Sequence, residues 1–142
     1  MSRPLVKEFE YKVSVKSLWQ ALTDAASMKQ WYFPQLQSME PTVGSVFQFH
    51  DGNADYQKVW IVTKVETERV FAHSWSYKGF PGTSEILFEL APAGSGTRLT
   101  LTQTGLETFP DHPHFGRERF EWGWDNLLGQ NLRNLLNQSV QS

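Results

Sequence analysis

His73 is the residue of this sequence best suited to acid–base chemistry near neutral pH. It lies in the segment 69–77, where Phe71, Trp75 and Tyr77 alternate with it and share its face. A free imidazole has a pKa of about 6.5, so it can exchange protons with a bound molecule at physiological pH. A single histidine on an apolar strand face is also the usual pattern of a core residue with satisfied hydrogen bonds. The sequence leaves both roles open.

Two amides occupy positions where apolar side chains are expected. Asn131 falls within the apolar arc of the predicted C-terminal helix, close to Trp124, and Gln103 continues the inward face of a predicted strand. A buried amide without hydrogen-bond partners costs about 1–3 kcal/mol. Each amide therefore needs a partner, which can be another core group, a buried water molecule or a ligand.

Aromatic residues make up 14% of the chain, with six Trp and ten Phe. Flat rings in that number are hard to pack without voids, and an apolar pocket with a few polar groups is the usual composition of a small-molecule site. We therefore expect an internal cavity that binds a small hydrophobic molecule, although aromatic alternation is also typical of an ordinary core. The candidate ligand-binding residues are Trp31, Phe47, Phe49, His73, Trp75, Phe88, Gln103, Trp124 and Asn131.

Other catalytic patterns are weak. The chain has no cysteine, which excludes thiolate metal sites and cysteine nucleophiles. His50 and Asp51 are adjacent in a predicted strand and so point to opposite faces, and the spacing of His112 and His114 near Asp111 matches no common zinc pattern. No phosphate-binding loop or dinucleotide motif occurs. We expect no metal and no cofactor, and we assign no catalytic residue.

Composition limits the remaining partners. The length of 142 residues suits one domain, and we expect residues 1–142 to form it. A net charge of −2 argues against nucleic acid and against an anionic membrane as partners. The first residues contain no apolar core of a signal peptide, and no run of 18 apolar residues occurs. We therefore expect a soluble, cytoplasmic protein.

The elements that position these residues follow from the periodicity of the apolar positions. The segment 5–13 alternates as a half-buried strand, and two short helices follow, capped by Ser14 and Asp24, the second ending near Trp31. A long helix is predicted from about residue 113 to about residue 138. Five further segments have the alternation or composition of strands, namely 43–51, 56–66, 69–77, 83–93 and 97–104.

Consecutive strands with short links predict an antiparallel meander with one face to bury, and the long helix is the element available to cover it. The predicted fold class is therefore α+β in two layers. Trp122 is predicted to point away from the buried face of the helix. An exposed tryptophan favours an interface, so we expect a C2 homodimer unless Trp122 packs under the N-terminal helices. The residues predicted to face the sheet are Phe120, Trp124, Leu127, Leu128 and Leu135.

Four motifs in this order resemble the START-like (SRPBCC) superfamily, and within it the branch related to the heat-shock-protein-90 ATPase activator. The resemblance covers nearly the whole chain and implies a helix-grip fold, in which six curved antiparallel strands wrap the long C-terminal helix, often around a cavity. It also implies that Gly123 lies where the helix approaches a neighbouring segment closely. The matching residues are Trp19, Ala21 to Asp24 and Trp31; Arg69, Val70 and Trp75; Gly96, Thr97, Leu99, Leu101 and Gly105; and Gly123 with Trp124.

The resemblance implies three functions, because this fold hosts several unrelated activities. The first is a carrier or sensor that binds a small hydrophobic molecule between sheet and helix. The second is an enzyme of the cyclase or aromatase kind, with His73 as the acid–base group. The third is an interaction module that stimulates a chaperone ATPase, although a single predicted domain departs from the chaperone activator.

Overall fold

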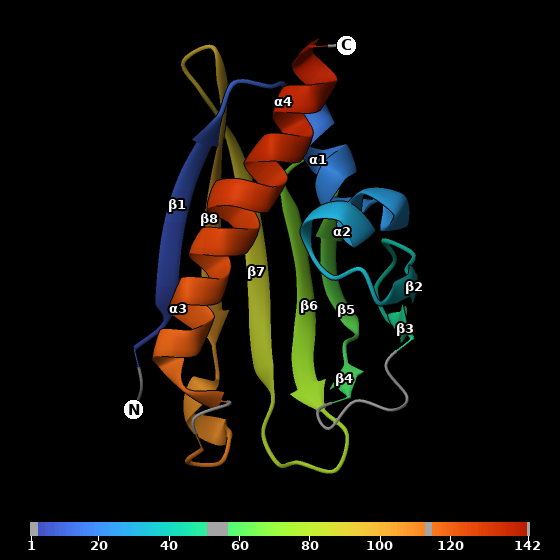
Figure 1. The fold of residues 1–142 in the computed structure, drawn as a ribbon, viewed down its shortest axis with the longest axis vertical. Coiled ribbons are helices and arrows are strands. Elements are labelled where there is room, and N and C mark those ends of the chain that lie inside the picture. Colours follow the sequence, from blue (N-terminus) through green and yellow to red (C-terminus); the bar gives the residue numbers. More distant parts are fainter. Residues whose placement is uncertain (1–2, 51–56, 113–114, 142) are drawn as a thin grey trace.

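The computed structural model describes residues 3–50, 57–112 and 115–141, in which one long helix lies across an antiparallel sheet (Figure 1). The chain begins with β1 (Leu5–Tyr11) at one edge of the sheet. Two short helices follow, α1 (Val15–Thr23) and α2 (Ala25–Trp31). They lie on the opposite side of the long helix from β1 (Figure 1).

Side-chain caps start both short helices, as predicted. The Ser14 hydroxyl accepts a hydrogen bond from the backbone N–H of Ser17, and the Asp24 carboxylate accepts one from Ser27, each at 3.1 Å. Each bond satisfies one of the N–H groups that a helix leaves without an internal partner at its first turn. Helix α2 then ends at Trp31, where the sequence predicts its end.

Six strands form the main sheet, and the predicted antiparallel α+β architecture is confirmed. The strand order is β1, β8, β7, β6 and β4, with β5 also paired to β6. Leu99, Leu101 and Gln103 on β8 are buried, as their alternation predicts. The remaining strands of this sheet are β4 (Lys58–Val59), β5 (Val62–Glu66), β6 (Val70–Tyr77), β7 (Ser84–Ala93) and β8 (Gly96–Thr104).

Two predicted strands differ from the structure. The segment 56–66 is interrupted, so that β4 and β5 pair separately with the two halves of β6. The segment 43–51 contributes only β3 (Gln48–Phe49), which pairs with β2 (Leu36–Ser38) in a second, two-stranded sheet. Strand β2 has no alternating pattern and was not predicted. Residue 51 of the one predicted segment and residue 56 of the other lie outside the described part of the chain.

The long helix has three parts, which are α3 (Arg117–Asn126), the π-helical segment Leu127–Leu132, here called the π segment, and α4 (Arg133–Gln141). It begins at Arg117 rather than near residue 113, and residues 113–114 lie outside the described chain. Its buried residues recur at every fourth position, namely Phe120, Trp124, Leu128, Leu132 and Leu136.

The π segment explains why this spacing can stay on one face. In a regular α-helix, a step of four residues turns by about 400°, so a row at this spacing drifts around the axis. The wider π turn takes up part of that drift. It also rotates Asn131 out of the apolar arc, and the side chain is exposed. The prediction that Asn131 is buried is therefore wrong, because it assumed an unbroken α-helical period.

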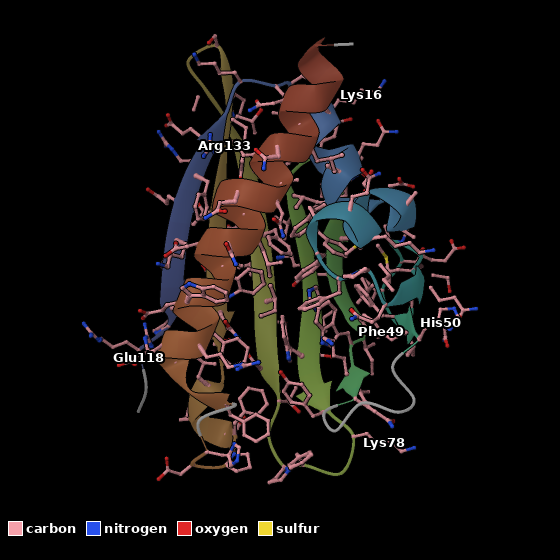
Figure 2. All side chains as sticks on the ribbon, viewed as in Figure 1. Lys16, Phe49, His50, Lys78, Glu118 and Arg133 are labelled. Carbon is pink, nitrogen blue, oxygen red and sulfur yellow. The ribbon has the colours of Figure 1, made fainter. Side chains whose placement is uncertain are left out.

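Rings from both layers fill the space between the long helix and the sheet, where side chains crowd together in Figure 2. Trp31 packs edge-on against Phe88, and Trp60 lies 4.4 Å from Trp75 between ring centroids. The first contact fixes α2 against β7, and the second fixes β6 against the segment between β4 and β5. No helix within the described residues is long and apolar enough to cross a membrane.

Candidate functional site

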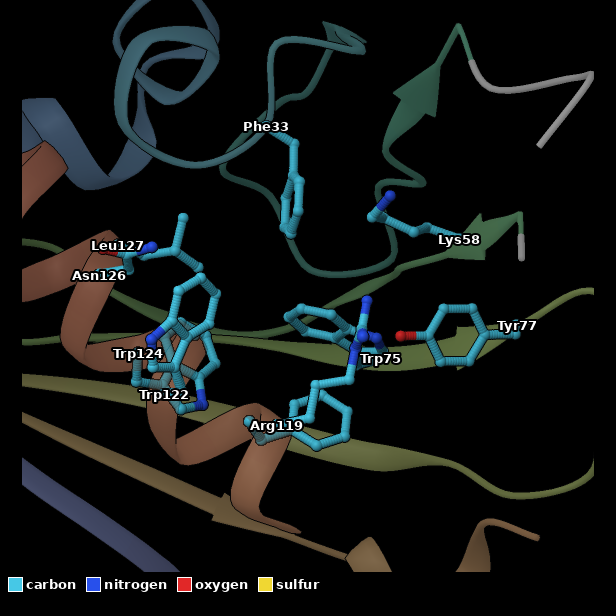
Figure 3. A pocket seen from close by; sticks show the side chains of 11 residues that line it. Phe33, Lys58, Trp75, Tyr77, Arg119, Trp122, Trp124, Asn126 and Leu127 are labelled. Carbon is cyan, nitrogen blue, oxygen red and sulfur yellow. The ribbon is translucent and has the colours of Figure 1, made fainter. Parts of the chain in front are cut away.

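An open cleft of about 320 Å³ lies where α3 faces the ends of β4 and β6 (Figure 3). Six aromatic side chains form most of its wall, and its volume is at the lower end of the range for ligand pockets, roughly 300–1,000 Å³. The lining residues are Phe33, Lys58, Trp75, Tyr77, Arg119, Phe120, Trp122, Gly123, Trp124, Asn126 and Leu127.

Helical and strand periodicity bring these residues together. Arg119, Gly123 and Asn126 recur at i, i+4 and i+7, and so share one face of α3. Trp75 and Tyr77 stand two residues apart near the end of β6, and so point to the same side of the sheet. Phe33 and Lys58 close the cleft from the loop after α2 and from β4 (Figure 3).

Trp75 forms the back wall. Its ring meets Phe120 and Trp124 edge-on, with centroid distances of 5.4 and 5.9 Å. Its indole N–H is buried and has no hydrogen-bond partner of normal geometry among the described residues. The N–H nevertheless lies near enough to the Tyr77 hydroxyl to lower the pKa of that phenol. Burial has the larger effect and leaves the pKa of Tyr77 raised, so the phenol stays neutral.

Two cationic side chains border the cleft. The Lys58 ammonium lies 4.5 Å from the centroid of the Phe33 ring and 5.7 Å from that of Phe49, which are cation–π distances. Arg119 is exposed and lies close enough to Tyr77 to act against the rise in its pKa. No carboxylate is among the described residues that line the cleft.

Gly123 lies at the centre of the helix face that borders the cleft. A Cβ atom built at this position meets no atom within 4 Å. The expectation that the helix approaches a neighbour closely here is therefore wrong. The missing side chain contributes open space instead. Beside it, Trp122 is 69% exposed at the rim, which excludes packing under the N-terminal helices.

The structure brings two of the nine candidate residues, Trp75 and Trp124, to this cleft. The other seven do not line it. Trp31, Phe47, His73, Phe88 and Gln103 are buried, Phe49 is half-buried and Asn131 is exposed.

His73 is fully buried and has both ring nitrogens occupied. Nδ1 lies 2.9 Å from the carbonyl oxygen of Ser74, so it carries the proton and donates. Nε2 lies 3.0 Å from the Tyr32 hydroxyl and accepts from it. The imidazole also stacks on Trp60 at 4.5 Å between centroids. Burial lowers the pKa of His73 to about 4, against the opposing effect of the bond to Ser74, so the ring is neutral near pH 7.

The two amides have partners within the protein. Gln103 is buried, and its Oε1 accepts a hydrogen bond of 2.8 Å from the indole N–H of Trp124, while its Nε2 has no partner among the described residues. The Asn131 amide donates to the carbonyl oxygen of Trp31 at 3.3 Å. That carbonyl belongs to the last turn of α2, where backbone acceptors lack internal partners. Asn131 therefore joins the long helix to α2.

Several cleft residues were not predicted from the sequence. Arg119 and Asn126 share the helix face of Gly123, so their spacing carried a usable signal. Phe33 comes from a loop and Lys58 from a predicted strand, and only the fold brings them to α3. Asp51 and His114, which the sequence analysis considered for catalysis and metal binding, lie outside the described residues.

Solved structures of known proteins share this fold. DynU16, from the dynemicin biosynthetic locus, matches with a TM-score of 0.77 at 21% identity, over 98% of this chain and 49% of that one. This chain thus spans about half the length of DynU16. PFC0360w, an HSP90 activator from Plasmodium falciparum, matches with a TM-score of 0.74 at 20% identity, over 96% of this chain and 97% of that one. The Aha1 dimer from Colwellia psychrerythraea matches with a TM-score of 0.62 at 17% identity, over 91% and 99%.

At these identities the structural matches show a START-like SRPBCC fold and nothing finer. No curated protein matches the sequence significantly. The family model described as Activator of Hsp90 ATPase homolog 1-like protein matches residues 12–137, which is most of the chain. The chain therefore belongs to the family of activator of Hsp90 ATPase homolog 1-like proteins.

Proposed function

We propose that this protein is a cytoplasmic carrier or sensor that binds a small hydrophobic molecule in the cleft between α3 and β6. The observation that carries the proposal is a cleft of about 320 Å³ with six aromatic side chains in its wall. Its position differs from the predicted one, because the candidate residues Trp31 and Phe88 pack ring against ring rather than around the cleft.

The direct test is native mass spectrometry of freshly purified protein, in which a retained ligand appears as added mass. The matched variants are Gly123→Leu, which places a side chain into the open space at the centre of the cleft, and Asn134→Leu, which adds the same side chain at an exposed position of α4. Gly123→Leu should lose the ligand and Asn134→Leu should keep it. Retention by both variants would contradict the proposal.

The same variants can be titrated with the neutral probe 2-naphthamide if no ligand is retained. Its planar ring system matches the aromatic walls, and burial of apolar surface is expected to drive its binding. Binding to the native protein and to Asn134→Leu, with loss in Gly123→Leu, would support the cleft as the site. A probe that binds none of the three proteins would count against it.

Cyclase or aromatase chemistry has less support. Such an enzyme needs a general base in reach of its substrate. The titratable residues that line the described part of the cleft are Lys58, Tyr77 and Arg119, and the pKa of Tyr77 is raised. His73 lies outside the cleft with both nitrogens bonded.

Stimulation of a chaperone ATPase is the second candidate function, and the family match favours it. PFC0360w, an HSP90 activator, is matched over 97% of its length, so one unit of this size is compatible with that activity. The test is the ATPase rate of an Hsp90 with and without this protein. An increase that Trp122→Ala abolishes would place the contact at the exposed rim; an unchanged rate would remove this candidate.

A homodimer through the same rim is also proposed. Trp122 is exposed, and exposed aromatic residues are enriched at interfaces. The related Aha1 from Colwellia psychrerythraea is a dimer. Analytical ultracentrifugation should show a dimer that Trp122→Ala dissociates, and a monomer at high concentration would contradict the proposal.

A further inference from the structure

We propose that the cleft selects planar aromatic anions, such as arenecarboxylates, over neutral and cationic molecules of the same shape. This inference rests on the proposed ligand-binding function, and adds the chemical class of the ligand. It is carried by the charges and hydrogen-bond donors around the cleft.

The carboxylates of α3 lie on a different face of the helix from Arg119. Asp125 pairs with Lys7 of β1 at 3.1 Å, and Glu121 pairs with Arg117 at 3.0 Å. Neither carboxylate lines the cleft. Arg119 does line it, and its guanidinium forms no ion pair or hydrogen bond with the described residues. Glu118, the remaining acidic residue of α3, is exposed and does not line the cleft either. The carboxylates of the helix thus lie away from the cleft, while Arg119 presents a cation to it.

The polar groups of the cleft are mainly donors. The indole N–H of Trp75 is buried in the wall without a partner of normal geometry among the described residues. The Tyr77 hydroxyl lies near this N–H. An acceptor oxygen on a ligand would give the N–H a partner of normal geometry. Arg119 is a donor only, and the Asn126 amide, which also lines the cleft, can donate and accept. A ligand that fits this set must offer acceptor oxygens, and a carboxylate offers two.

The aromatic walls alone would also suit a quaternary ammonium ion, which favours rings on several sides. Here Lys58 already lies over the Phe33 ring at 4.5 Å, and Arg119 borders the same space. A cationic ligand would bring a third positive charge close to these two. The ring-lined shape therefore favours a planar ligand, and the fixed charges favour an anion.

A naphthalene series with one ring system and three charges tests the inference by isothermal titration calorimetry. The probes are 2-naphthoate, 2-naphthamide and the (2-naphthyl)trimethylammonium ion. Partly exposed ion pairs contribute modestly, so 2-naphthoate should bind roughly three- to tenfold more tightly than 2-naphthamide at low salt. The ammonium ion should bind most weakly. Added salt should weaken the binding of 2-naphthoate and leave that of 2-naphthamide unchanged.

The matched variants are Arg119→Gln and Arg69→Gln. Both remove one positive charge, but Arg69 lies at the opposite end of β6 and pairs with Glu66. Arg119→Gln should weaken 2-naphthoate roughly two- to fivefold without affecting 2-naphthamide, and Arg69→Gln should change neither.

Equal binding of 2-naphthoate and 2-naphthamide, with both lost in Gly123→Leu, would overturn the anion preference while leaving the ligand-binding function intact. Tighter binding of the ammonium ion would overturn it in the same way. Absence of binding by all three probes would count against both proposals.

Discussion

The hydroxyl of Tyr11 donates a hydrogen bond of 2.8 Å to the main-chain carbonyl oxygen of Leu128, and so joins the end of β1 to the π segment. A π turn shifts the helical hydrogen-bond pattern, and side chains can bond to the carbonyl groups that this shift affects. Arg133 does so at the next residue, where its Nε donates to the carbonyl oxygen of Gly129 at 3.3 Å. Its guanidinium also lies over the Tyr11 ring, 4.9 Å from the centroid.

Replacing Tyr11 with Phe should lower the free energy of unfolding by about 1–3 kcal/mol, because a buried acceptor would lose its donor. The ring and its contact with Arg133 are kept, so the change isolates the hydroxyl. Urea denaturation followed by circular dichroism measures the difference. A loss below roughly 0.5 kcal/mol would show that the Leu128 carbonyl has another adequate partner.

Stability should depend on pH through His73. Its pKa is about 6.5 in the unfolded chain and about 4 in the folded protein, so the unfolded chain binds more protons between these values. The contribution is present above about pH 6.5 and is lost as the pH falls towards 4. The total is roughly 3 kcal/mol, at about 1.36 kcal/mol per pKa unit. Urea denaturation of the native protein and of His73→Gln is compared across this pH range. The carboxylates contribute equally to the free energy of unfolding of both proteins, so the difference isolates His73. If the free energy of unfolding depended on pH in the same way for both proteins, the lowered pKa of His73 would be contradicted.

Gln103 and Trp124 should be energetically coupled. The indole N–H of Trp124 donates to Gln103 Oε1 at 2.8 Å, and both side chains are buried. A double-mutant cycle with Gln103→Leu and Trp124→Phe should give a coupling energy of about 0.5–3 kcal/mol. Additive losses would mean that the two side chains contribute independently.

Gly123→Ala should stabilise the protein by about 0.5–1 kcal/mol, because alanine is the better helix former and its Cβ meets open space. Gly129→Ala is the matched control. Its Cβ would contact the Phe9 ring at 3.4 Å, so its gain should be smaller. Thermal denaturation of both variants checks the order. An equal gain at the two positions would show that the helix can shift away from β1.

Asn131→Ala should lower stability by about 0.5–1.5 kcal/mol through loss of the bond to the Trp31 carbonyl, with no effect on ligand selectivity. Asn134→Ala, at an exposed position of the same helix, should be close to neutral. A changed ligand preference in Asn131→Ala would show that Asn131 contacts the ligand after all.

Much of the main sheet was predictable because β7 and β8 alternate between buried and more exposed residues, and because β6 carries a ring at every second position from Phe71 to Tyr77. The two short helices were predictable because Ser14 and Asp24 are common capping residues. The π segment was not, since its hydrogen bonds involve Tyr11, more than a hundred residues away in the chain. Asn131 was predicted to be buried because the sequence does not reveal the π segment.

The candidate site was harder to predict than the fold. Trp75 and Trp124 could be identified because their neighbours mark one face of a strand and one face of a helix. Lys58 and Phe33 reach the same space through the folded path of the chain, which a local pattern does not record. His73 showed the opposite difficulty, because inward orientation alone cannot distinguish a ligand contact from a residue bonded to Tyr32 and Ser74.

The exposure of Trp122 gives the protein a built-in optical reporter. Of the six tryptophans, Trp122 is exposed, Trp19 is half-buried and the other four are buried. An indole in water emits at longer wavelength than one in an apolar core, and a polar quencher such as iodide reaches it first. The long-wavelength edge of the emission band, and the part of the emission that iodide quenches, therefore report on the rim of the cleft. A molecule that enters there, or a partner that covers it, will shift this emission to shorter wavelength and shield it from iodide without any attached label.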